Sequence, residues 1–289
     1  MKNKTAVLLT FLLLLGASKS FAGKPVLDSI RVDGNTRRFW MSLPDEMKEG
    51  APLVFVLHGY GNPGSPDTWM NAASSRHGFA LCVPCGLKDP AGQPSWNVGY
   101  PFQEGWKVDD VKAMCSIARH VCRKYELSKE NVFLTGMSNG GEMCYLLAYS
   151  DQKVFKALAS LSGLTMEWLY RTEEAVRPIP IMEIHGTEDR TSEWNGDLAN
   201  KGGWGAYMST PIGVGYWIAR NRCEGYTSET VDSKSDNGRK IVKHRYSADN
   251  TSKCDVWLYE VIGGPHSWFT EDLDVGEEVW SFFSKYIKD

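Results

Sequence analysis

The chain has 289 residues, of which 42% are apolar and 23% are charged, a composition typical of a globular protein. Its formal net charge of −3 offers no basic footprint for nucleic acid or for an anionic membrane, so we expect neither as a partner. This length fits one large α/β domain at least as well as two small domains.

The first 22 residues have the three parts of a signal peptide. Lysines at positions 2 and 4 open it, residues 5–17 form an apolar stretch of about 13 residues, and residues 20–22 suit a cleavage site. The alternative is a membrane anchor, which needs about 20 apolar residues. We therefore expect residues 1–22 to be removed and residues 23–289 to be secreted or periplasmic, without a membrane segment.

Strand-like and helix-like patterns alternate along the rest of the chain. The expected strands are the apolar runs at 53–57, 79–83, 131–135, 157–161, 179–184 and 256–261. The expected helices are 108–125, 142–149 and 275–287. This alternation predicts a single α/β domain over residues 23–289, with a mostly parallel sheet and helices on both faces. Residues 188–223 interrupt the pattern with a Gly- and Trp-rich stretch, which we interpret as a long functional loop or cap.

The seven cysteines are an odd number, so at least one stays out of any disulfide. Cys115 and Cys122 fall on the apolar side of the helix expected at 108–125, roughly 10 Å apart and too far for a bridge, so we interpret them as core residues. Cys223 and Cys254 flank a polar excursion and are the best candidate pair. Closing that loop would stabilise the fold by roughly 3–4 kcal/mol.

The segment Gly136-Met137-Ser138-Asn139-Gly140 matches the pattern G-x-S-x-G. A β-rich run precedes it and a helix-forming run follows it, as a strand-to-helix nucleophile elbow requires. The glycines suit so tight a turn because larger side chains would collide there. We therefore predict that Ser138 is a nucleophile; the alternative is a structural turn with an exposed serine.

A serine hydroxyl is a weak nucleophile and needs a base within hydrogen-bond reach. The chain order Ser…Asp/Glu…His places that base late, after a strand. His266 fits, since it follows the run at 256–261. His244 is also late but lies among basic residues in what we interpret as a polar loop. His58 and His185 each end a strand before a glycine and fit buried core histidines.

The third member should be a carboxylate that follows an intervening strand. Asp189 meets this condition in the segment His185-Gly186-Thr187-Glu188-Asp189, and Glu188 is the alternative. Such a carboxylate fixes the imidazole tautomer and stabilises the imidazolium as it forms. Asp189 could also simply cap a turn.

A tetrahedral intermediate needs two backbone N–H donors. One should belong to Asn139, the residue after the nucleophile, and the other to the loop that begins at His58, most simply Tyr60. The loss of one donor would raise the barrier by roughly 3 kcal/mol.

Five blocks together resemble the feruloyl esterase and polyhydroxybutyrate depolymerase-like family, which is similar to carbohydrate esterase family 1. They are His58-Gly59, VDDV at 108–111, GMSNGG at 136–141, HGTED at 185–189 and GPHSW at 264–268. The resemblance implies an α/β-hydrolase fold and an acyl-enzyme mechanism without a metal or organic cofactor. It also implies Ser138, Asp189 and His266 as the triad, and a disulfide near Cys223 and Cys254.

Aromatic residues near the expected site suggest a carbohydrate or phenolic substrate. Trp194 and Trp204 follow the acid in the loop-rich stretch, and Trp268 lies two residues after the base. Their rings could stack on a sugar or on a phenol, or could pack in the core or the cap. The resemblance favours a feruloyl ester on a xylan-type plant polysaccharide, followed by acetylated xylan and then a polyhydroxyalkanoate.

Two other classes of protein compete with an esterase. A carbohydrate-binding protein without catalysis would have little reason to retain Ser138, Asp189 and His266 in this order. A metallohydrolase would need a ligand cluster, and the sequence has no H-E-x-x-H motif. We therefore expect an enzyme without metal or cofactor.

Overall fold

A computed structural model describes residues 23–249 and 253–288, so the predicted signal peptide lies outside the described residues. The fold is built on a ten-stranded sheet. Across the sheet, the strands follow the order β1 (Val26–Val32), β2 (Asn35–Ser42), β4 (Ala80–Pro84), β3 (Leu53–Leu57), β7 (Val132–Met137), β8 (Ala157–Leu161), β9 (Ile181–Gly186), β12 (Val256–Ile262), β11 (Lys240–Ala248) and β10 (Cys223–Asp232). A separate small pair is formed by β5 (Leu87–Lys88) and β6 (Pro94–Ser95).

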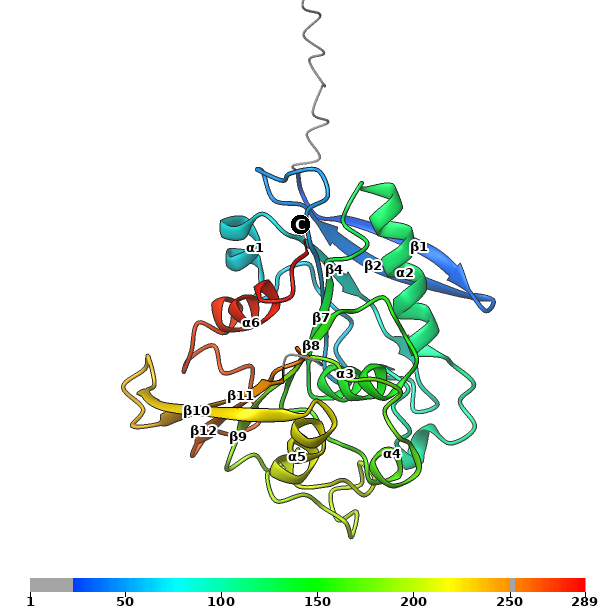
Figure 1. The fold of residues 1–289 in the computed structure, drawn as a ribbon. Coiled ribbons are helices and arrows are strands. Elements are labelled where there is room, and N and C mark those ends of the chain that lie inside the picture. The colour runs from blue at the N-terminus through cyan, green and yellow to red at the C-terminus, as the bar shows by residue number, and fades with distance from the viewer. Residues whose placement is uncertain (1–22, 250–252, 289) are drawn as a thin grey trace, which may run out of the picture.

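The centre of the sheet is parallel and its two ends are antiparallel. The strands from β4 to β12 run parallel, and the hairpins β1–β2 and β10–β11 extend the sheet at its edges (Figure 1). Every residue of β3, β4 and β8 is buried, which explains their continuous apolar runs, since parallel strands are covered on both faces. The mostly parallel sheet predicted from the sequence is confirmed.

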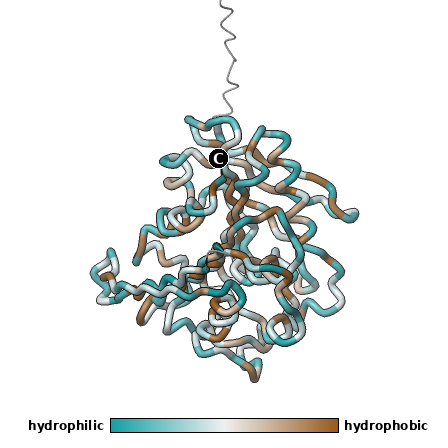
Figure 2. Tube along the Cα trace, in the orientation of Figure 1, coloured by the Kyte–Doolittle hydropathy of each residue, from teal (hydrophilic) through white to brown (hydrophobic). Residues whose placement is uncertain are grey.

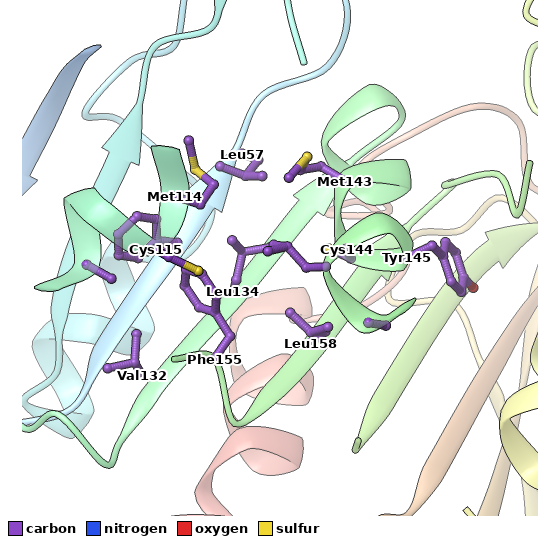
Figure 3. Packing of buried hydrophobic residues seen from close by; sticks show 14 of the residues in the cluster. Leu57, Met114, Cys115, Val132, Leu134, Met143, Cys144, Tyr145, Phe155 and Leu158 are labelled. Atoms are coloured by element: carbon purple, nitrogen blue, oxygen red, sulfur yellow. The ribbon is translucent and has the colours of Figure 1, made fainter. Parts of the chain in front are cut away.

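Helices cover both faces of the sheet. The helices α1 (Asn71–His77) and α6 (Val275–Ser284) lie on one side, and α2 (Asp110–Lys124) and α3 (Asn139–Tyr149) lie on the other (Figure 1). Two apolar cores result, one on each face, and the apolar central strands run between them (Figure 2). In the core under α2 and α3, Leu134 and Leu158 from the sheet pack near Met143 and Cys144 from α3 (Figure 3).

Local sequence explains where α2 forms and which face it buries. Asp109 caps the helix, because its side chain accepts a hydrogen bond from the amide of Lys112 at 2.8 Å. Cys115 and Cys122 are both buried in the core, as we predicted from their helical spacing. None of the helices in the described part of the chain is both long enough and apolar enough to span a membrane.

Two polar or glycine-rich stretches contain more regular structure than we expected. The stretch at 188–223 includes α5 (Thr210–Arg220), whose Trp217 is completely buried; α4 (Glu167–Thr172) precedes it. The polar excursion after Cys223 is the hairpin β10–β11, and its polarity reflects the exposed edge strand β10. The loop setting predicted for His244 is therefore wrong: it lies in β11, and its Nδ1 is 2.8 Å from the hydroxyl of Tyr226.

Candidate active site

Ser138 occupies a strained turn between β7 and α3. Its backbone φ is 55° and its ψ is −124°, a conformation that is rare for residues other than glycine. The Ser138 amide donates to the carbonyl of Leu161 at 2.8 Å, and the Ser138 carbonyl accepts from the amide of Glu142 at 2.9 Å. The strand, the sharp turn and the helix are the arrangement that the G-x-S-x-G pattern predicts.

Close backbone contacts explain the two glycines of this pattern. A Cβ atom on Gly140 would lie 2.6 Å from the carbonyl oxygen of Leu57 and 2.8 Å from that of His58. A Cβ atom on Gly136 would lie 2.5 Å from the carbonyl oxygen of Gly140. Only glycine therefore lets the elbow pack against the end of β3.

The loop after β3 passes beside the serine. A Cβ atom on Gly59 would lie 3.4 Å from Cβ of Ser138, so the backbone of Gly59 and Tyr60 runs next to the elbow. Asn139 is the first residue of α3, where a backbone N–H has no acceptor within the helix. Both predicted oxyanion donors, Tyr60 and Asn139, thus belong to segments adjacent to Ser138.

The fully buried Trp96 ties these two segments together. Its amide donates to Oδ1 of Asn139 at 2.7 Å, and its carbonyl accepts from Nδ2 of Asn139 at 3.1 Å. Its indole N–H donates to the carbonyl of His58 at 2.9 Å. Trp96 therefore fixes the start of α3 and the loop after β3 at once. Sequence analysis missed this residue because no motif surrounds it.

The parallel pairing of β9 with β12 brings the predicted acid and base together. Nδ1 of His266 lies 2.7 Å from Oδ2 of Asp189, whose Oδ1 accepts the amides of Thr191 and Ser192 at 2.8 Å each. Asp189 is only 4% exposed, whereas the side chain of His266 is 21% exposed. A carboxylate at Nδ1 leaves Nε2 able to accept a proton. Glu188 is exposed, so the geometry favours Asp189 over this alternative.

The surroundings of Asp189 keep it ionised. Burial acts to raise the pKa of Asp189, but the hydrogen bond and charge of His266, the amide of Ser192 and the charge of His185 hold this pKa below its usual value. The hydrogen bonds of the described residues do not include one between Ser138 and His266. Such bonds are often long in free enzymes and shorten when substrate binds.

The three tryptophans proposed as substrate contacts have different surroundings. The ring of Trp204 lies 5.4 Å from that of Tyr60, next to the oxyanion loop, with Tyr100 and Phe102 completing an aromatic cluster. Trp194 packs edge-on against the buried ring of His185 at 5.9 Å, a contact that fits the core better than a sugar.

Trp268 contacts a different aromatic ring from those around Trp194 and Trp204. Its ring is 6.0 Å from that of Trp69. Both rings line a cavity of about 310 Å³ that His58 and Thr270 also border. Cavities of this size lie at the lower end of those that hold small ligands.

Two further predictions concern metal binding and the pairing of Cys223 with Cys254. The described residues contain no cluster of three or more His, Cys, Asp or Glu side chains suited to hold a metal ion. Sγ of Cys223 lies 3.9 Å from the carbonyl oxygen of Cys254, so these residues are neighbours, as their predicted pairing requires. Cys223 is a thiol in the structure, and the disulfide stays a prediction.

A buried charged residue in β9, Glu183, was not predicted from the sequence. Glu183 is 1% exposed and its Oε1 lies 2.9 Å from Nδ1 of His185, which is completely buried as expected for a core histidine. Positions 183 and 185 of a strand share one face, so the spacing was the available signal. The neighbours of Glu183 in the sequence are apolar, so the pattern predicted only a buried strand.

Comparisons with known proteins identify the family of this chain. Residues 39–191 match the esterase PHB depolymerase family. The protein named "Probable feruloyl esterase C" from Aspergillus flavus is 30% identical over 71% of this chain and 77% of its own length. The bifunctional acetylxylan esterase/xylanase XynS20E of Neocallimastix patriciarum is 26% identical over 92% of this chain and 36% of its own length.

A solved structure has the same fold. The acetyl xylan esterase from Aspergillus awamori superposes with a TM-score of 0.62 at 13% identity, covering 90% of this chain and 99% of that one. These matches confirm the resemblance and the α/β-hydrolase fold that we predicted, and they favour an enzyme over a carbohydrate-binding protein without catalysis. The chain belongs to the esterase PHB depolymerase family and is a carboxylic ester hydrolase.

Proposed function

We propose that this protein is a serine esterase that releases ferulate or a related hydroxycinnamate from a xylan-type plant polysaccharide. The observation that carries the proposal is the 2.7 Å hydrogen bond between His266 and the buried Asp189. Ser138 stands in the strained elbow between β7 and α3, at the same carboxyl edge of the parallel sheet. This is the edge at which α/β folds place their reacting groups.

In the proposed first step, Oγ of Ser138 attacks the ester carbonyl carbon while Nε2 of His266 takes the hydroxyl proton. Asp189 stabilises the imidazolium that forms. The carbonyl oxygen becomes an oxyanion, which the backbone N–H groups of Tyr60 and Asn139 would bind. As the tetrahedral intermediate collapses, His266 gives its proton to the sugar oxygen, and the polysaccharide leaves as an alcohol.

In the second step, water replaces the sugar. His266 removes a proton from the water molecule, which attacks the acyl-enzyme carbonyl, and the proton then returns to Oγ of Ser138 as the free acid leaves. The same base, acid and oxyanion donors thus serve both steps. All of these groups belong to the chain itself, so the mechanism needs neither a metal nor a cofactor.

Two features support a hydroxycinnamate as the acyl group. The Aspergillus flavus relative is named a feruloyl esterase. The half-buried rings of Tyr60, Phe102 and Trp204 pack around the buried Tyr100 beside the oxyanion loop and could contact a phenol. The acetylxylan esterase name of the Neocallimastix relative supports acetylated xylan as the second candidate.

The predicted signal peptide supports export. We propose that the mature protein begins near Gly23 and meets its polysaccharide outside the cytoplasm, either secreted or in the periplasm. N-terminal sequencing of the protein recovered outside the cytoplasm tests this. A mature chain that still starts at Met1 would contradict the proposed cleavage.

The activity test compares wild type with Ser138→Ala on methyl ferulate, acetylated xylan and a short-chain nitrophenyl ester. We expect ferulate release by wild type and at least a roughly thousandfold lower kcat in the variant, because the nucleophile is lost. Release of acetate alone would retain the serine mechanism and change the substrate. Equal rates for both proteins on all three esters would refute Ser138 as the nucleophile.

A further inference from the structure

A second histidine approaches the carboxylate that holds His266. Nε2 of His185 lies 3.7 Å from Oδ2 of Asp189, the same oxygen that lies 2.7 Å from Nδ1 of His266. His185 is completely buried, and Glu183, two residues before it in β9, is 1% exposed. The mechanism above uses neither of these two side chains.

The hydrogen-bond partners of His185 determine its protonation. Nε2 lies 2.8 Å from the backbone carbonyl of Ser192, which can only accept, so Nε2 must carry a proton. Nδ1 lies 2.9 Å from Oε1 of Glu183, and an ionised carboxylate also only accepts. With Glu183 ionised, both ring nitrogens donate and the ring is an imidazolium.

The neighbours of the pair act on the charges of both side chains. Burial raises the pKa of Glu183, but the hydrogen bond and charge of His185 act to lower it, as does the hydrogen bond that the hydroxyl of Tyr145 donates to Oε2 at 2.8 Å. Tyr145 lies on α3 at the margin of the core cluster (Figure 3). Burial acts to lower the pKa of His185, but the hydrogen bond and charge of Glu183, the Ser192 carbonyl and the charge of Asp189 raise this pKa above its usual value.

Three other titratable groups near the pair have raised pKa values, which favour their neutral forms near pH 7. Burial and the nearby Glu183 raise the pKa of Glu142 to about 8, against the hydrogen bonds from Tyr100 and Asn139. Burial also raises the pKa of Cys144 well above its usual value, and that of Tyr207, near Asp189, to about 12. The carboxylates that the structure pairs with His185 are Glu183 and Asp189.

We propose that His185 is a positioning residue: held doubly protonated between Glu183 and the Ser192 carbonyl, it places a fixed positive charge beside the catalytic carboxylate. The proposal rests on the proposed function, in which Asp189 and His266 are the acid and the base. The cation restrains Oδ2 of Asp189 from one direction while His266 binds it from another. It also repels the second positive charge that protonation of His266 would add.

The decisive variant is Glu183→Gln, which removes the carboxylate that keeps His185 charged and retains the imidazole ring of His185. The new amide can donate to Nδ1, so His185 becomes neutral while Nε2 still donates to Ser192. We expect the acid limb of the pH profile of kcat/KM, measured on a short-chain nitrophenyl ester, to move up by roughly 0.5–1 unit. We expect the plateau value to fall by less than about threefold, because Asp189 and His266 remain in place.

The variant His185→Gln removes the ring itself, and Glu188→Gln is the matched control. We expect His185→Gln to lower kcat by roughly tenfold with little change in KM, because Asp189 loses its restraint. Glu188 is exposed and adjacent to Asp189, so its loss removes an equal charge outside the buried pair. The acid limb of this control should stay within about 0.2 unit of wild type.

Nitrogen NMR of the histidine rings tests the charge without any activity. Wild type should show two protonated ring nitrogens for His185 near pH 7, and Glu183→Gln should show one. A wild-type ring with a single proton, or an acid limb that does not move in Glu183→Gln, would overturn the proposal. If wild type hydrolyses no ester, the proposed function fails, and NMR still decides the protonation of His185.

Discussion

The carboxyl ends of β3 and β9 carry the same pair of residues, His-Gly: His58-Gly59 directly follows β3, and His185-Gly186 are the last two residues of β9. The two histidines have opposite hydrogen-bond environments. At the end of β3, Nε2 of His58 accepts the amide of Gly86 at 2.9 Å and Nδ1 lies 2.8 Å from the carbonyl of Gly59. One nitrogen accepts and the other donates, so the ring is neutral. In β9, both nitrogens of His185 face acceptors.

The difference divides the site into a neutral side, around His58, and a charged side, around His185 and Asp189. The His58 side carries the oxyanion loop, where a neutral ring keeps the backbone in place. The His185 side carries Asp189, where a charged pair can influence the base. A histidine at the end of a buried strand is therefore a structural residue or an electrostatic one according to the partners that other segments supply.

The largest effect should come from removing the charge of Asp189, which the imidazoles of His185 and His266 both approach. Asp189→Asn keeps the size of the side chain but places an amide opposite Nδ1 of His266, which favours the wrong tautomer. We expect kcat to fall by roughly 10⁴-fold on the nitrophenyl ester, with KM nearly unchanged.

Glu188→Gln is the matched control for this prediction because it removes a charge from the neighbouring position. It should retain at least about half of the wild-type kcat. A loss below tenfold in Asp189→Asn, or an equal loss in the control, would show that Asp189 is not the partner of the base.

The buried environment of His58 on the neutral side predicts that the stability of the fold depends on pH. Burial lowers the pKa of His58 to about 4, although the hydrogen bond to Gly59 acts to raise it. The unfolded chain takes up this proton near pH 6.5, whereas the folded protein resists it until about pH 4. The folded state should therefore lose roughly 3 kcal/mol through this residue as the pH falls across that window.

The variant His58→Gln tests this prediction, because its amide can satisfy both Gly86 and Gly59 without titrating. Urea unfolding at pH 7 and pH 4.5 should show a smaller loss of unfolding free energy on acidification in His58→Gln than in wild type. Equal losses would mean that His58 is protonated in the folded protein. His185 should act with the opposite sign: its raised pKa contributes stability in acid that is lost as the pH rises.

Much of this molecule could be predicted from local patterns. Continuous apolar runs located the central strands, and the residues around Ser138 predicted the strained turn, because a strand, two glycines and a helix impose it locally. The placement of Asp189 beside His266 followed from chain order, since parallel neighbours end at the same edge. These predictions succeeded where a short stretch of chain determines its own structure.

The rest depends on partners distant in sequence. Trp96 reaches Asn139 across 43 positions, and nothing near Trp96 signals this contact. The edge hairpin β10–β11 looked like a loop because its exposed strand needs no apolar pattern. The opposite protonation states of His58 and His185 also could not be predicted from local sequence. The amide of Gly86 and the carbonyl of Ser192 help to determine these states.

The smallest effect should come from removing the hydrogen bond between Trp96 and the carbonyl of His58 on the neutral side. Trp96→Phe removes the indole N–H that donates to the carbonyl of His58 at 2.9 Å, and it retains an aromatic ring beside the ring of His58. We expect kcat to fall by roughly five- to tenfold, because a lost hydrogen bond of about 1 kcal/mol loosens the oxyanion loop. KM should change by less than about twofold, because the substrate pocket is otherwise intact.

The half-buried Trp40 in β2 provides the control for that change, since its removal leaves the site untouched. Trp40→Phe should keep kcat within about twofold of wild type. If Trp96→Phe also stays within that range, the carbonyl of His58 does not need the indole, and the backbone bonds of Trp96 to Asn139 suffice to hold the loop. If its kcat falls while the acid limb of the profile stays fixed, the neutral side acts on the oxyanion alone and the charged side sets the pH range.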